Sequence, residues 1–415
     1  MFRLFFLLLL APFVVAEFGH TLLPRFAFRS GYVNLNHGSY GSAPRDVTAN
    51  ASAWSAQCEE SPDAWYRDGL GIDTTYEFQN QVRVRMAQYI NANVNDTVFV
   101  DNASNGVNAV MRSLARSMPS GKKILLLSTA YGMVKATVAG YLEPESTLFV
   151  NISLPGSDAG ILEKVSAALE ANAGTIYAAS FSHIVSVPAV ILPVAQLIAL
   201  CHSHGVLVLI DGAHALGQIP VDVTALDADF WLGNGHKWLY SPKGSALLWV
   251  RPDRQALIEP TTISWEGRGL THFQMAFSYV GTTDNSRTLA MSAALDFRKS
   301  VGTEDAIVEY MHTLAVTGGR RLAEMWGTEL LFNDTSRFAA MVDVRVPTTN
   351  ATLKNLIGPA LMTRFNTFVP IYDLSGVGGA IPNTFYARVS CQIYTELSDI
   401  EFLGNSVKAI IASGG

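Results

Sequence analysis

Short apolar runs alternate with amphipathic stretches through the middle of the chain, from about residue 95 to residue 250. The runs are rich in β-branched residues and have strand length, whereas the stretches between them have helical spacing. This alternation predicts a largely parallel sheet with helices on both faces, with ligands bound at the carboxyl ends of the strands. The predicted strands are Thr97–Val100, Ile124–Leu127, Thr147–Val150, Thr175–Ala179, Val206–Ile210, Phe230–Leu232 and Ala246–Val250.

Helical patterns flank and follow this region. The segment Pro193–His204 has Pro at its first helical position, ends in basic residues and stops at Gly205, which predicts a helix that leads into the strand Val206–Ile210. After residue 300 a long helix, Glu304–Trp326, precedes strands near Ala339–Val344 and Phe385–Ser390. These elements predict a second, smaller α+β domain.

The length and apolar content support two domains. The chain has 415 residues, of which 49% are hydrophobic, and that is more than one average domain holds. We expect an N-terminal arm and substrate loop at 17–60, a large domain at 61–300 and a small domain at 301–415.

The first residues have the pattern of a secretory signal. Met-Phe-Arg precedes an apolar run, Leu4–Val15, and the small residue Ala16 follows it. The run is shorter than the ~20 residues that a membrane-spanning helix needs, so we expect residues 1–16 to be removed and the mature chain to have no membrane span. Six sequons for N-glycosylation favour the same secretory, extracellular route: Asn50, Asn95, Asn102, Asn151, Asn333 and Asn350.

Charge and cysteine content exclude several functions. Lys and Arg number 29 against 35 Asp and Glu, and no segment concentrates either sign, so nothing indicates a nucleic-acid partner. Cys58, Cys201 and Cys391 are too few and too scattered for a disulfide framework or a metal site. At most one pair could bridge, and Cys201, inside an apolar helical pattern, is expected to be a buried free thiol.

Two polar motifs follow neighbouring predicted strands and carry the chemical argument. Asp211 ends the buried run Val206–Ile210, where a carboxylate is costly unless a cation meets it; a protonated pyridine nitrogen is such a cation. Lys237 follows Phe230–Leu232 among Gly and aromatic residues, where desolvation lowers the pKa of an amine and prepares it to form a Schiff base. Taken singly, Asp211 could cap a helix and Lys237 could lie on the surface. Their occurrence at consecutive strand ends is more specific.

In this context the sequence resembles the class V, cysteine-desulfurase-type enzymes that use pyridoxal 5′-phosphate (PLP), and within them the isopenicillin N epimerase-like branch. The resemblance rests on Asp211-x-x-His214, Gly235-His-Lys-Trp238, the opening Asn34–Pro44 and the stretch Arg388–Tyr394, and it spans about residues 30–405. It implies the α/β fold of PLP-dependent transferases of fold type I, the aspartate aminotransferase fold, with Lys237 as the Schiff-base lysine.

The phosphate of PLP is expected at the start of a helix. Ser104, Asn105 and Gly106 follow the strand Thr97–Val100 and precede a helical pattern, so their amides and the helix dipole suit a dianion. Ser104 could also be an ordinary helix cap, a role that is compatible with phosphate binding. By resemblance, Asn234 and His236 add phosphate contacts. A glycan at Asn102 is not expected, because it would enter this pocket.

The resemblance also assigns residues around the cofactor ring. Tyr131 matches a position from which an aromatic ring stacks on the pyridine, with core packing as the alternative. His214 matches a residue near the 3′-oxygen of the ring, and Ser186 is a further candidate for that oxygen.

Substrate and partner contacts complete the expected site. Arg388 is the candidate for the substrate α-carboxylate, because a guanidinium binds a carboxylate bidentately, and a surface ion pair is the alternative. Asn36, His37 and Ser39 are expected on the substrate side. Gly281-Thr282-Thr283-Asp284 resembles a turn that touches the phosphate bound by a second subunit, which implies a homodimer with shared sites.

Abstraction of the α-proton of an amino acid by Lys237 is the expected first step. Family members that form a persulfide carry a mobile Cys well before the carboxylate-binding Arg, and no Cys occurs here between residues 328 and 387. We therefore favour β-elimination (C–S lysis) from cysteine or an S-substituted cysteine. Epimerisation is the alternative and needs a second acid/base, for which Tyr131 or His37 qualifies; transamination and a non-catalytic secreted binding protein are further alternatives.

Overall fold

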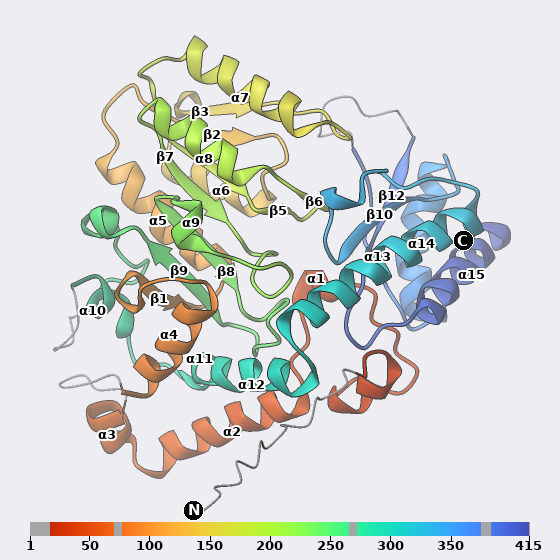
Figure 1. Cartoon of the computed structure of the whole chain (residues 1–415), viewed down its shortest axis with the longest axis horizontal. Helices are drawn as coiled ribbons and strands as arrows, with labels where there is room; N and C mark the ends of the chain where they lie inside the picture. The colour runs from red at the N-terminus through yellow and green to blue at the C-terminus, as the bar shows by residue number, and fades with distance from the viewer. Residues whose placement is uncertain (1–16, 70–76, 265–271, 375–382, 415) are drawn as a thin grey trace, which may run out of the picture.

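A seven-stranded sheet forms the centre of the larger part of the chain in the computed structural model, which describes residues 17–69, 77–264, 272–374 and 383–414 (Figure 1). The strand order is β1-β9-β8-β7-β4-β2-β3. β9 runs antiparallel to β1 and β8, and the pairs β8-β7, β7-β4, β4-β2 and β2-β3 are parallel. The strands are β1 Thr97–Val100, β2 Lys123–Leu127, β3 Thr147–Val150, β4 Ile176–Ser182, β7 Leu207–Asp211, β8 Phe230–Asn234 and β9 Ala246–Val250.

Alternate residues of these strands face two separate apolar layers. In β7, Val208 and Ile210 belong to the core that includes α7 and α8, whereas Leu209 belongs to the core that includes α5, α6 and α10. Both faces are covered, which explains the continuous apolar runs in the sequence. The helices are α5 Ala103–Ser117, α6 Gly132–Tyr141, α7 Asp158–Ala171, α8 Val194–Ser203 and α10 His272–Ser278.

A smaller antiparallel sheet lies beside the large one and has the order β10-β12-β11. Its strands are β10 Met341–Arg345, β11 Ile371–Asp373 and β12 Phe385–Ser390, and its helices are α13 Glu304–Trp326, α14 Ala351–Arg364 and α15 Leu397–Ser413. A hairpin of β5 Ile184–Val185 and β6 Val190–Ile191 reaches from the large sheet toward the small one (Figure 1).

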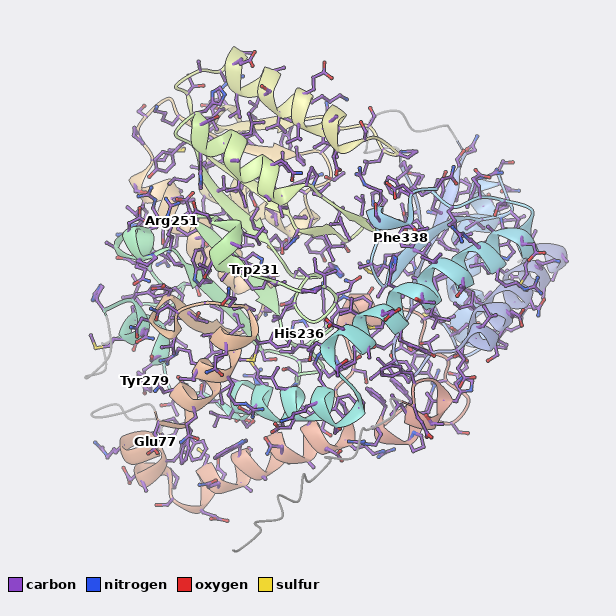
Figure 2. The ribbon with its side chains drawn as sticks, viewed as in Figure 1. Glu77, Trp231, His236, Arg251, Tyr279 and Phe338 are labelled. Carbon is purple, nitrogen blue, oxygen red and sulfur yellow. The ribbon has the colours of Figure 1, made fainter. Side chains whose placement is uncertain are left out.

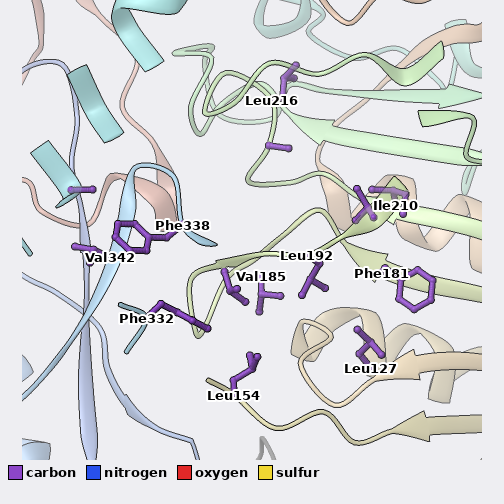
Figure 3. Close-up of a cluster of buried hydrophobic side chains, with 14 of the residues drawn as sticks. Leu127, Leu154, Phe181, Val185, Leu192, Ile210, Leu216, Phe332, Phe338 and Val342 are labelled. Carbon is purple, nitrogen blue, oxygen red and sulfur yellow. The ribbon is translucent and has the colours of Figure 1, made fainter. Parts of the chain in front are cut away.

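One apolar core joins the two sheets across this hairpin. Figure 3 shows Leu127, Phe181 and Ile210 of the large sheet, Val185 and Leu192 of the hairpin region, Val342 of the small sheet, and Phe332 and Phe338 near it. Burial of such side chains stabilises by roughly 1.5–3 kcal/mol each. The position of the small sheet relative to the large one is therefore set by continuous packing.

The N-terminal segment crosses both parts. α1 His37–Tyr40 lies between them, and α2 Arg45–Glu60 packs against α11 Ser286–Leu289 and α12 Met291–Val301 (Figure 1). The remaining α-helices of the described chain are α3 Pro62–Ala64, α4 Glu77–Tyr89 and α9 Val223–Leu226.

The strand pattern read from the sequence agrees with these elements, with some differences. The reversed strand β9, the β5–β6 hairpin and β11 were not expected. Pro193 is the residue before α8 rather than its first helical residue. β4, β7 and β8 extend further than predicted, so that Ser182, Asp211 and Asn234 are their last residues.

The N-terminal signal and the cysteines were the subjects of two further predictions. The predicted signal, residues 1–16, lies outside the described residues. Within the part that is described, no helix is both long enough and apolar enough to cross a bilayer. Cys201 and Cys391 are buried free thiols and Cys58 is a partly buried one, so the expectation for Cys201 is confirmed.

Candidate active site

A cavity of about 490 Å³ opens at the carboxyl ends of the parallel strands. Ser182, Asp211 and Asn234 end β4, β7 and β8 and bring polar side chains to one edge of the sheet, as this topology requires. The loop after β8 adds His236, which lies near the middle of the molecule in Figure 2. The volume is in the range of small-molecule and cofactor sites.

Lys237 lines this cavity, and its amine contacts His214. The distance from Lys237 Nζ to His214 Nε2 is 3.1 Å. Burial, together with the positive charge of Arg388, lowers the pKa of Lys237 to about 8, although Asp211 opposes this shift. An appreciable fraction of the amine is therefore unprotonated near neutral pH, as a nucleophile or general base requires.

The ring of His214 has a defined tautomer. Burial lowers its pKa well below the ordinary range, so the ring is neutral. Trp238 Nε1 donates to His214 Nδ1 at 3.4 Å, which places the proton of the ring on Nε2. The Nε2–H then donates to the unprotonated amine of Lys237, in agreement with the lowered pKa of that amine.

Asp211 is a buried carboxylate at the floor of the cavity, with 5% of its surface exposed. Its Oδ1 accepts a hydrogen bond from Ala213 N at 3.0 Å. Burial raises its pKa, and the Ala213 amide and the charge of Lys237 oppose that shift. Such a carboxylate stabilises a cation placed in the cavity.

The first turn of α5 forms one wall. Asn102 caps the helix, because its side chain accepts from Asn105 N at 2.9 Å, and Asn234 Oδ1 accepts from Ala103 N at 2.8 Å. The cap is therefore Asn102, which corrects the alternative that assigned this role to Ser104. Ser104 lines the cavity between the amides of Ala103 and Asn105, which already have acceptors, so its own amide and hydroxyl and the dipole of α5 are the groups that suit an anion.

Other predicted phosphate ligands divide into two groups. His236 lines the cavity, and its Nδ1 is buried without a hydrogen-bond partner among the described residues. Asn105 instead donates to Thr261 Oγ1 at 3.0 Å and is absent from the lining of this cavity. Gly106 is also absent from it, since it packs against Leu232 and Val100.

Arg388 reaches the opposite side of the cavity from β12. It is only 2% exposed, so the alternative of a surface ion pair is wrong. Its Nη1 donates to Ser186 O at 2.8 Å and Ser186 Oγ at 3.0 Å, and its Nη2 donates to Asn36 Oδ1 at 3.0 Å and Ser39 Oγ at 2.8 Å. Its Nε has no partner among the described residues. A carboxylate that binds Arg388 uses Nε or replaces one of these contacts.

These contacts add to what was expected of four residues near the substrate and the cofactor ring. Ser186, which was expected at the cofactor ring, lines the cavity, and its hydroxyl and carbonyl accept hydrogen bonds from Arg388. Ser39 lines the cavity. Asn36 is absent from the lining and accepts a hydrogen bond from Arg388. His37 is absent from the lining because Tyr394 and the Lys237 carbonyl occupy its two ring nitrogens, each at 2.8 Å. The structure does not place His37 against a substrate.

Tyr131 and Tyr40 are exposed aromatic residues at the mouth of the cavity, with 54% and 72% of their surfaces accessible. The alternative of core packing for Tyr131 is therefore wrong. Tyr40, Lys243 and Ser182 also line the cavity and were missed from the sequence. The position of Ser182 at a strand end was a usable signal, whereas Tyr40 reaches the cavity only through the course of the N-terminal segment.

Thr282 and Thr283 are exposed and lie outside this cavity in the single chain. Thr282 Oγ1 contacts Tyr279 OH at 3.1 Å, and Thr283 O accepts from Tyr66 OH at 3.0 Å. Within one chain these residues complete no part of the site.

The donor set fits one kind of bound group. The first turn of α5 at Ser104 suits a phosphate, Asp211 suits a cationic ring atom, and Lys237 suits an aldehyde carbon. PLP has all three features. Among the described residues, no group of His, Cys, Asp or Glu could hold a metal ion.

Comparison with known proteins gives an independent view. Residues 69–366 match the family described as aminotransferase class-V. The chain is 29% identical to the L-cysteine desulfhydrase-like protein lolT1 of Epichloe uncinata, over 95% of this chain and 96% of the relative. It is 28% identical to isopenicillin N epimerase of Amycolatopsis lactamdurans, over 91% of this chain and 94% of that relative. A solved complex of the cystine C–S lyase C-DES with its reaction product, cysteine persulfide, superposes with a TM-score of 0.78 at 21% identity. It covers 91% of this chain and 97% of that one.

Proposed function

The chain belongs to the aminotransferase class-V family, and from that premise we propose that it is a PLP-dependent lyase that breaks the C–S bond of cysteine or an S-substituted cysteine. The predicted family and the predicted fold type I are confirmed, and the chain is a PLP-dependent enzyme. The observation that carries the proposal is the single cavity that holds Lys237, Asp211 and Arg388 together without any cysteine among its described lining residues.

Different residues of the cavity would bind different parts of PLP. Ser104 at the start of α5, with Asn234 and His236, would hold the phosphate, Asp211 the pyridine nitrogen, and Lys237 the aldehyde carbon. Bound PLP withdraws electrons from the α-carbon of an amino acid that is joined to it. The residues of the chain supply orientation and proton transfer.

Arg388 and Lys237 act on the substrate from two sides of the cavity. Arg388 binds the α-carboxylate and so fixes the orientation of the α-carbon. The Lys237 amine, which is unprotonated in part because of its burial, takes the α-proton. Loss of the thiol from the β-carbon, followed by hydrolysis, converts cysteine and water into pyruvate, ammonia and hydrogen sulfide without any change in net oxidation state.

The cysteine positions support release of free sulfide rather than transfer to the enzyme. Cys391 lies three residues after Arg388 but is fully buried, and burial raises the pKa of its thiol well above the ordinary range. None of the three cysteines lines the described cavity. A thiolate that accepts sulfur must be accessible and have a low pKa.

Epimerisation is the second candidate, favoured by one relative's identity and by Tyr131 at the mouth of the cavity. It requires an acid/base on the face opposite Lys237. Of the two residues considered for this role, His37 is occupied by Tyr394 and Lys237 O, which weakens the case.

Product analysis distinguishes these reactions. Purified holoenzyme is incubated in deuterated water with L-cysteine, S-substituted cysteines and a panel of L- and D-amino acids, and K237A serves as the control. Pyruvate, ammonia and sulfide from a cysteine substrate, absent with K237A, are expected for the lyase. Deuterium at the α-carbon of an intact amino acid, without pyruvate, would instead identify an epimerase.

We also propose that the chain enters the secretory pathway and that the active unit is a homodimer. The apolar run before Ala16 and four exposed sequons, at Asn95, Asn151, Asn333 and Asn350, support secretion. The exposed turn with Thr282 and Thr283 supports contact with a second chain. Removal of N-glycans by a glycosidase should lower the mass of the secreted protein; an unchanged mass with residues 1–16 retained would contradict secretion.

A further inference from the structure

The short segment Asn34–Gly41, here called the arm segment, packs directly on the loop that carries Lys237. A side chain at Gly41 would place its Cβ 1.6 Å from His236 O and 2.9 Å from Lys237 Cα. Only glycine fits such an approach, and its φ of 66° lies in the left-handed region. The arm segment therefore touches the backbone of the residue that bears the reactive amine.

His37 makes the polar contact between the arm segment and this loop. Its Nε2 is 2.8 Å from Lys237 O, and its Nδ1 is 2.8 Å from Tyr394 OH. A carbonyl oxygen only accepts, so the ring proton is on Nε2 and Nδ1 accepts from the Tyr394 hydroxyl. Asn34 Nδ2 in turn donates to Tyr394 OH at 2.8 Å, which completes a chain with one direction of donation.

The ring is held in a single state and orientation. Burial lowers the pKa of His37 to about 4, and the positive charge of Lys243 acts in the same direction. The ring also packs against Trp238 at 5.5 Å and Tyr240 at 5.8 Å between centroids. A neutral, fixed imidazole of this kind orients a backbone group and takes no part in proton transfer.

The structure assigns His37 as a positioning residue for Lys237: the His37 Nε2–H holds the Lys237 carbonyl and so fixes the point from which the reactive amine extends. The assignment rests on the proposed function only in that Lys237 holds PLP. The next carbonyl, Trp238 O, accepts from Arg298 Nη1 at 2.9 Å, so two consecutive peptides are held.

The arm segment also holds the substrate side of the cavity. Asn36 and Ser39, on either side of His37, accept hydrogen bonds from Arg388. This one turn of chain therefore fixes Lys237, the proposed base, relative to the Arg388 guanidinium that would bind the substrate carboxylate. A long, flexible lysine side chain gains most from such support, because misplacement of about 1 Å is costly in catalysis.

A matched pair of substitutions tests this role. His37→Gln keeps an amide N–H near the position of Nε2. His37→Asn has an amide N–H only near the position of Nδ1, so it loses the hydrogen bond to Lys237 O. The rate at which apo protein captures PLP, the fraction of PLP that borohydride attaches to Lys237, and kcat and KM for cysteine are measured. We expect H37N to lower the capture rate and kcat about tenfold with little change in KM, because about tenfold corresponds to the loss of one hydrogen bond. H37Q should stay within about threefold of wild type in both rates.

Tyr394→Phe gives a second measurement that does not alter His37. Loss of the hydroxyl leaves Nδ1 without its donor and removes one of the two hydrogen bonds that orient the ring, so an intermediate decrease in capture rate is expected. If H37Q is as impaired as H37N and KM rises in both, or if Y394F and H37N both behave as wild type, the positioning role is wrong. If wild type captures PLP but releases no pyruvate from cysteine, the proposed reaction fails while the capture rates still test His37.

Discussion

At the scale of single residues, the site depends on an amine whose pKa is lowered by its surroundings. Burial of the Lys237 amine and the positive charge of Arg388 both disfavour its protonated form. Asp211 acts in the opposite direction, so the value near 8 results from competing effects. This balance leads to a prediction about pH.

Capture of PLP by the apo protein should rise with pH and reach a plateau above about pH 9. Only the unprotonated Lys237 amine attacks the aldehyde, and its pKa is about 8, whereas an ordinary lysine would show a rise through pH 10. Stopped-flow absorbance from pH 6 to pH 10 measures the midpoint. Asp211→Asn removes a charge that favours the protonated amine, so its midpoint should lie below that of wild type. A wild-type midpoint near 10 would contradict this account.

Arg388→Lys should raise KM for cysteine and lower kcat/KM by roughly 30-fold, which corresponds to about 2 kcal/mol. Lysine keeps the charge but cannot reproduce a planar fork that contacts Ser186, Asn36 and Ser39 at once. Steady-state kinetics with cysteine measures the loss. Cysteamine, which lacks the carboxylate, is the control: its binding should change little, and an equal loss for both compounds would show that Arg388 has only a structural role.

At the scale of elements, the carboxyl ends of β4, β7 and β8 and the first turn of α5 form one surface. Asn234 at the end of β8 accepts from Ala103 N, so a strand end and a helix start are joined directly. Asn102 then caps the same helix and also lines the cavity. Different substitutions of Asn102 can therefore change the stability of α5 and the binding of the phosphate independently.

Substitution of Asn102 separates the two effects. Asn102→Ala removes the cap and should destabilise the apo protein by about 1 kcal/mol in urea denaturation. Asn102→Asp keeps a cap acceptor, so its apo stability should be close to wild type, but its negative charge faces the phosphate and should weaken PLP binding at least tenfold by titration. Equal PLP affinity in wild type and N102D would argue against a phosphate at this helix.

At the scale of the whole molecule, continuous apolar packing joins the two sheets and leaves the cavity between parts that are far apart in the sequence. Asp211 ends a strand of the large sheet, Lys237 lies in the loop after β8, Arg388 comes from the small sheet, and the arm segment contacts both Lys237 and Arg388. The exposed turn with Thr282 and Thr283 belongs to none of these contacts within one chain.

Mixed dimers test the proposed sharing of sites. K237A and the double variant T282A/T283A should each have low activity alone, and co-expression should restore part of it. A mixed dimer then has one site with an intact lysine and an intact turn from the other chain. Light scattering should give twice the mass of one chain. Absence of recovery in dimers shown to be mixed would contradict the shared site.

The sequence by itself determined the features that depend on local spacing. Strand and helix periodicity predicted the core of the large sheet and the helix Glu304–Trp326, and the motifs after two strands identified Asp211 and Lys237 as members of one site. These succeed because burial on two faces of a sheet and the start of a helix each impose a pattern on neighbouring residues.

The tertiary structure alone decided how distant side chains are used. His37 was expected at the substrate but is hydrogen-bonded to the Lys237 carbonyl, 200 positions away, and Ser186, which lines the cavity as expected, also accepts from Arg388, 202 positions away. Asn105 turns toward Thr261 although Ser104, its neighbour, lines the cavity. No local pattern encodes such choices, because the direction of each hydrogen bond depends on which donor or acceptor the packing of the two sheets and the arm segment brings within reach.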